Sequence, residues 1–133
     1  MPQTTTDRRT YMELQKPRIL TLGQLEYVAS DYNFPRRPLI FINACESMTM
    51  SPLFYDGFVP YFIANGSAGV VGTVSWVPAI FASRFAIRFF EGFFQKESID
   101  DIIARLRREF LAQNHNPLGL YYASYCNSNL SLA

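Results

Sequence analysis

This chain has few cysteines, one histidine and almost no net charge. Its two cysteines, Cys45 and Cys126, are too few for the disulfide framework of a small secreted domain. Residues 1–10 are polar and carry no apolar signal segment, so we expect a reducing, cytoplasmic setting. The formal net charge of +1 provides no electrostatic basis for binding nucleic acid or an anionic membrane.

Long uninterrupted apolar runs are also missing. The longest apolar region, residues 76–94, is broken by Arg84, Arg88 and Glu91, so it is not a membrane span. The glycines of residues 66–72 have the wrong spacing for either glycine-rich phosphate-binding motif, and no lysine follows them. We expect neither a metal ion nor a cofactor.

Aromatic residues are abundant, with 12 Phe and 8 Tyr in 133 residues. This length suffices for one domain with its own core. Such an aromatic content predicts either a tight core or apolar faces that contact another polypeptide.

The chain is organised around the apolar residues 39–42, which predict a strand over residues 39–44 buried on both faces of a sheet. Cys45 follows directly, where open α/β sheets place their reactive groups, beyond the carboxyl ends of the strands. Two interpretations stay open from position alone. Cys45 is a nucleophile, or it is a small buried apolar side chain, as free cysteines often are.

The remaining elements follow from apolar spacing and from capping residues. Residues 1–17 predict a flexible arm, and Thr21 predicts the cap of a helix ending at residue 28. Further helices are predicted over residues 54–64, 78–94 and 99–113, and further strands over residues 68–74 and 118–125. In the helix of residues 78–94 the polar side chains form one stripe, which predicts three buried sides.

The order of these elements predicts an α/β fold. One helix between the first two strands makes them parallel, and two helices before the last strand make it antiparallel. The expected architecture is a sheet of two parallel strands and a final antiparallel strand, with helices on the faces.

Four segments resemble the CHAT domains, caspase-like peptidases that are often fused to TPR repeats. They occur along this chain in the same order as in the family. Residues 43–47 (NACES) look like the family's nucleophile motif, and residues 69–78 (GVVGTVSWVP) are similar to its glycine-threonine-tryptophan-proline stretch. Residues 116–122 (NPLGLYY) are similar to its last strand, and residues 20–25 resemble the segment before its first matched strand.

The resemblance implies a caspase–haemoglobinase-type three-layer sandwich and peptide-bond cleavage by a Cys–His dyad. Cys45 matches the nucleophile, and Ser75 and Trp76 match the strand that borders the substrate side chain. Ala79 departs from the family, which usually has Asp there, and this puts any contact of that carboxylate in doubt.

The histidine of the dyad is the larger departure. In caspases it lies about 50 residues before the cysteine, and no histidine precedes Cys45 here. The only histidine, His115, is expected at the same end of the sheet but two strands away, about 10 Å sideways from strand spacing alone. A general base must approach within about 3 Å or one water, so we expect His115 to be a solvated loop residue.

Residues 18–133 are therefore expected to be the C-terminal half of a caspase-like domain that acts on a peptide or protein substrate. The missing histidine leaves its activity open, and we expect little or none from the chain alone. The alternative is a non-catalytic interaction module, whose exposed edge or helix faces pair with a complementary N-terminal half or with a second copy. Cys126 is expected far from Cys45, without a disulfide between them.

Overall fold

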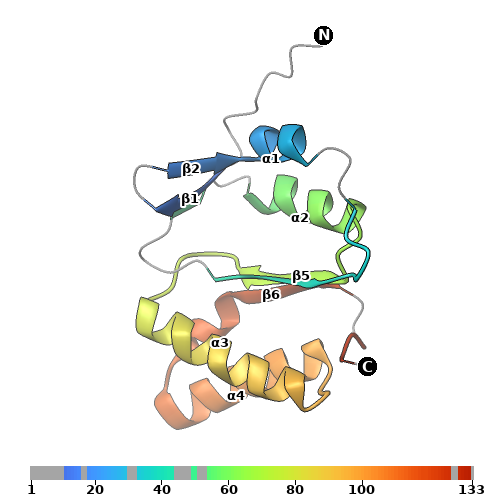
Figure 1. Ribbon diagram of the computed structural model, residues 1–133. Helices are drawn as coiled ribbons and strands as arrows, with labels where there is room; N and C mark the ends of the chain where they lie inside the picture. The colour runs from blue at the N-terminus through green and yellow to red at the C-terminus, as the bar shows by residue number, and fades with distance from the viewer. Residues whose placement is uncertain are drawn as a thin grey trace.

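The computed structural model describes residues 11–15, 18–29, 33–43, 49–50, 54–126 and 129–132 (Figure 1). The elements in chain order are β1 (Tyr11–Gln15), β2 (Arg18–Thr21), α1 (Leu22–Val28), β3 (Leu39–Ile42), β4 (Thr49–Met50), α2 (Phe54–Ala64), β5 (Gly69–Thr73), α3 (Ala79–Phe94), α4 (Ile99–Asn114), a 3-10 helix η1 (Pro117–Tyr121) and β6 (Tyr122–Cys126).

The main sheet has the strand order β3-β5-β6. β3 and β5 are parallel, with Ile42 opposite Gly72, and β6 runs antiparallel to β5, with Tyr122 opposite Thr73. The predicted strand directions are therefore confirmed. All five residues of β5 are buried, because this strand is central and both of its faces are covered.

Helices cover both faces of this sheet, as predicted (Figure 1). Successive side chains of a strand point to opposite faces, so Val70 packs with Phe58 of α2 while Val71 faces the core formed by α3 and α4. The core between the sheet and the helices α3 and α4 is rich in aromatic rings, and Phe85 and Phe89 of α3 are fully buried in it. The fold is thus α/β with a small mixed sheet between two helical layers.

The helix boundaries follow local capping chemistry. Thr21 and Gln24 form a reciprocal capping box at the start of α1, and the Ser98 hydroxyl accepts a hydrogen bond from the Asp101 amide at the start of α4. Pro78 precedes α3, where its missing amide proton costs nothing. Gly66 follows α2 with φ +93°, the left-handed conformation that glycine adopts most easily. None of the helices within the described ranges is long and apolar enough to cross a membrane.

Two predicted elements are corrected. Residues 11–15, predicted as part of a flexible arm, form β1, which pairs with β2 and β4 in a second small sheet. Residues 118–121, predicted as the start of the last strand, belong to η1 instead, because the Asn116 side chain accepts a hydrogen bond from the Leu118 amide and caps this turn.

The three buried sides predicted for α3 are also corrected. Ile80, Ile87 and Phe94 are 73%, 59% and 70% exposed. The sheet covers one side of the helix and α4 covers another, so the side facing away from the sheet remains open to solvent.

Candidate functional site

The carboxyl ends of β3 and β5 meet at one edge of the main sheet. Ile42 lies opposite Gly72, so the next residue of each strand, Asn43 and Thr73, reaches that same edge. Cys45 follows Asn43 by two residues and lies outside the described residues, so its assignment as a nucleophile stays a prediction. The structure does establish what surrounds the end of β3 that leads to it.

The Asn43 side chain is held on both of its polar atoms. Its Nδ2 donates a hydrogen bond to the Ala82 carbonyl oxygen at 2.8 Å, and its Oδ1 accepts one from the Tyr122 hydroxyl at 2.6 Å. The amide thus connects β3 with the first turn of α3 and with the first residue of β6. This anchoring fixes where the chain leaves the strand toward Cys45.

Tyr122 is itself held rigidly. It is fully buried, and its ring stacks on Phe85 with centroids 3.6 Å apart and planes 8° apart. Arg107 of α4 donates a hydrogen bond to its carbonyl oxygen. The sequence predicted a strand here but not the hydrogen bond to Asn43, because the two residues are far apart in the sequence. The one signal for this bond was that a tyrosine hydroxyl in a buried strand needs a hydrogen-bond partner.

Ser75 and Trp76 lie just beyond β5 at the same edge and are exposed, Trp76 by 62%. The segment is anchored on either side of them: the Val74 amide donates to the Tyr121 carbonyl oxygen at 2.7 Å, and Val77 is fully buried. Both exposed side chains therefore project from a backbone that is held on either side. The structure therefore brings Asn43, Ser75 and Trp76 to one edge of the sheet.

His115 is the C-cap of α4, in the left-handed conformation with φ +49°, and it is exposed. The prediction of an exposed loop histidine is confirmed. β6 begins at the edge that carries Asn43, since Tyr122 is opposite Thr73, but the whole of η1 separates His115 from that strand.

Cys126 ends β6 opposite Gly69, at the other end of the sheet. It is a free thiol, and burial, followed by the negative charge of Asp100, raises its pKa. A raised pKa lowers the thiolate fraction at neutral pH, so Cys126 is a poor nucleophile. Its predicted separation from Cys45 stays a prediction, because Cys45 lies outside the described residues.

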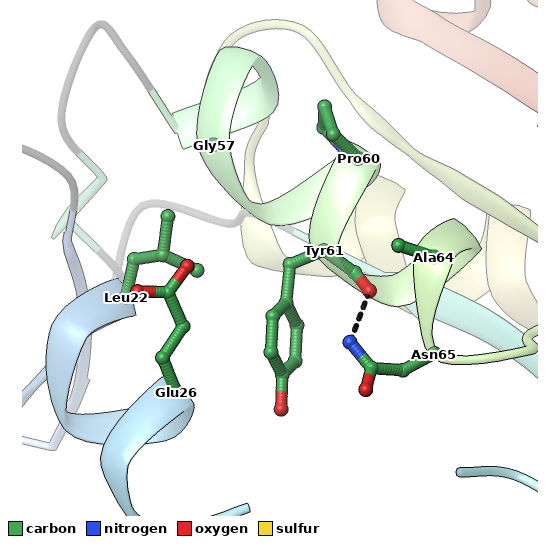
Figure 2. Close-up of a pocket in the computed structure, with 7 residues that line it drawn as sticks. All are labelled: Leu22, Glu26, Gly57, Pro60, Tyr61, Ala64 and Asn65. Carbon is green, nitrogen blue, oxygen red and sulfur yellow. Dashed lines mark hydrogen bonds between the residues drawn. The ribbon is translucent and has the colours of Figure 1, made fainter. Parts of the chain in front are cut away.

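A shallow groove of about 580 Å³ lies between α1 and α2 (Figure 2). Its lining residues are Leu22, Glu26, Gly57, Pro60, Tyr61, Ala64 and Asn65. Burial, with a smaller effect of the Glu26 charge, raises the pKa of Tyr61. The end of α2 leads into the amino end of β5, so the part of the groove lined by Ala64 and Asn65 lies toward the opposite end of the sheet from Asn43.

Comparison with known proteins relates the chain to a protease. It is 35% identical over 98 residues to a probable protease of Vitiosangium sp., a match that covers 72% of the chain. The match covers only 13% of that relative's length. No protein-family model matches the chain, and no solved structure matches it.

Proposed function

We propose that this chain is the nucleophile-bearing part of a caspase-like cysteine peptidase of the CHAT type. The observation that carries the proposal is the anchored end of β3, where Asn43 is fixed by two hydrogen bonds and a cysteine follows two residues later. The similarity to a probable protease supports the same conclusion.

In this proposal the Cys45 thiolate attacks the carbonyl carbon of the scissile peptide bond. Backbone amides near Cys45 stabilise the resulting oxyanion. The amine leaves with a proton from the general acid, a thioester to Cys45 remains, and water hydrolyses it to regenerate the thiol. Exposed Trp76 borders the substrate side chain, and Ser75 lies beside it.

The base that deprotonates Cys45 comes from polypeptide outside these 133 residues. His115 is the only histidine of the chain, and it is an exposed helix cap separated from β6 by η1. The related probable protease is much longer than this chain, which leaves room for such a segment. By itself the chain is then a weak peptidase or an inactive one, and a reducing cytoplasm keeps its thiol available.

Chemical rescue tests this proposal on the chain alone. Added imidazole supplies the missing base, so it should accelerate hydrolysis of an activated peptide ester by the wild-type chain above the imidazole background. Cys45→Ala should show only the background, and Cys126→Ala should behave as the wild type. His115→Ala should also leave the rescued rate unchanged.

A second measurement addresses the edge of the sheet. A peptidyl chloromethyl ketone should alkylate Cys45 faster than Cys126, and Trp76→Ala should slow the reaction at Cys45 alone. Equal labelling of the two cysteines, together with no imidazole-dependent rate above that of Cys45→Ala, would reject the proposed function.

A further inference from the structure

The outer side of α3 carries a regular apolar stripe that no described element covers. Ile80, Ile87 and Phe94 recur every seven residues and are all more than half exposed. On the opposite side of the same helix, Phe81, Phe85 and Phe89 are buried against the sheet and α4. α3 is therefore apolar on two sides, and the described residues cover only one of them.

The stripe has the spacing of a helix-pairing seam. With Ser83 and Phe90, the positions 80, 83, 87, 90 and 94 alternate in steps of three and four, the pattern of the contact positions of a coiled coil. Phe90 is half-buried beside Phe41, with ring centroids 5.2 Å apart, and so links the seam to β3. Four of the five seam positions are apolar.

Charges flank one side of this seam one heptad apart. Arg84 and Glu91 are both exposed. Each directly follows a seam residue in the sequence, Ser83 and Phe90 respectively. When two copies of such a helix pair in antiparallel orientation, these positions face each other, so Arg84 of each copy meets Glu91 of the other. In parallel orientation they would face Ala79 and Ala86 of the other copy instead, and no charge of that copy would pair with them.

We propose that α3 is a docking surface for α3 of a second copy of this chain, in antiparallel orientation. Ile87 lies near the two-fold axis, and Ile80 of each copy packs against Phe94 of the other. A helix of 16 residues is about 24 Å long. One helix pair buries less than the roughly 800 Å² per partner of a standard stable interface, so the dimer is weak and depends on protein concentration.

Sedimentation equilibrium of the full chain over a range of concentrations tests this proposal by charge exchange. Arg84→Glu and Glu91→Arg should each raise the dimer dissociation constant about tenfold, because each change places like charges opposite each other twice. The double variant Arg84→Glu/Glu91→Arg restores both attractive pairs, so its dissociation constant should return to within about threefold of the wild-type value.

Two further variants complete the experiment. Ile87→Ser should give a monomer with an unchanged circular dichroism spectrum, and the matched control Arg108→Glu, an exposed arginine of α4, should leave dimerisation unchanged. A wild-type chain that stays monomeric at its highest soluble concentration overturns the proposal. So does a dimer that is insensitive to these α3 variants, because another surface then forms it.

Discussion

The Tyr122 hydroxyl donates a hydrogen bond to Asn43 Oδ1 at 2.6 Å, although the two residues are 79 positions apart in the sequence. β3 and β6 are not neighbours in the sheet, because β5 lies between them. The tyrosine and asparagine side chains, with the hydrogen bond between them, therefore bridge two strand spacings, about 10 Å. The first residue of the last strand thus holds the end of the strand that leads to the predicted nucleophile.

Removing this hydroxyl should loosen the end of β3. In Tyr122→Phe the ring still stacks on Phe85, but Asn43 Oδ1 loses its donor in a partly buried site. We expect the free energy of unfolding to fall by about 1–2 kcal/mol. We also expect slower labelling of Cys45 by a peptidyl electrophile. Urea unfolding measures the first effect, and mass-spectrometric labelling rates measure the second.

Tyr121→Phe is the matched control, because Tyr121 precedes Tyr122 and its side chain is 41% exposed. It should change neither the urea midpoint nor the labelling rate. If Tyr122→Phe lowered stability and left labelling at the wild-type rate, the tether would be structural only and would not position Cys45.

The secondary structure followed from local signals that act within a few residues. Thr21 predicted the cap at the start of α1, and the predicted bounds of α2 and α4 agree with the structure to within one residue. The direction of β6 followed from counting helices, since each one reverses the chain.

What the sequence could not predict depends on contacts between distant segments. The bond between Asn43 and Tyr122 needs the sheet order, and the exposure of Ile87 depends on which sides of α3 the sheet and α4 cover. The strand predicted from residue 118 failed at its start because the capping of η1 by Asn116 overrode its apolar pattern. Cys45 lies outside the described residues, so its role rests on its place in the sequence.

The thiol of Cys126 should react slowly, and the charge of Asp100 should be part of the reason. Burial is the larger cause of its raised pKa and the Asp100 carboxylate is the smaller one. Asp100→Asn removes the charge and keeps an oxygen that accepts the Ser124 hydroxyl bond. We expect this variant to lower the pKa of Cys126 and to raise its iodoacetamide labelling rate near neutral pH modestly, by less than about tenfold.

Asp101→Asn is the control for the lost charge in the first turn of α4. It should leave the Cys126 labelling rate unchanged, because the negative charge that helps to raise the pKa of this thiol is that of Asp100. An equal effect of the two variants would assign the change to the helix terminus rather than to Asp100.

Gly69 is required by the close approach of β6. A Cβ atom at this position would collide with the Cβ of Cys126, its partner in the ladder. Gly69→Ala should therefore lower the free energy of unfolding by about 1–3 kcal/mol, the usual cost of overpacking. In a Cys126→Gly background the same substitution should cost at least about 1 kcal/mol less, because the colliding atom is gone.

Urea unfolding of the four chains of this double-mutant cycle measures the coupling. Ser124→Gly is the control background, since Ser124 lies in the same strand opposite Val71. Gly69→Ala should cost its full amount there. Equal costs in the Cys126→Gly and Ser124→Gly backgrounds would mean that the strain comes from the β5 backbone and not from Cys126.

Tyr61 should make the fold less stable in alkali. Burial and the Glu26 charge raise its pKa above the ordinary value of 10.0, so the folded chain holds the phenol proton more tightly than the unfolded chain does. The resulting stabilisation is complete below the unfolded pKa of about 10 and is lost as the pH rises through the folded pKa. The free energy of unfolding should therefore decline with pH in this window.

Tyr61→Phe has no proton to lose, so its unfolding free energy should decline less steeply above about pH 10 than that of the wild type. Glu26→Gln removes only the smaller cause of the shift, so its decline should be intermediate. Urea unfolding at several alkaline pH values measures these slopes, and Tyr27→Phe controls for an exposed phenol on α1. If Tyr27→Phe reduced the slope as much as Tyr61→Phe does, the alkaline decline would be a general effect of the tyrosines and not of the raised pKa of Tyr61.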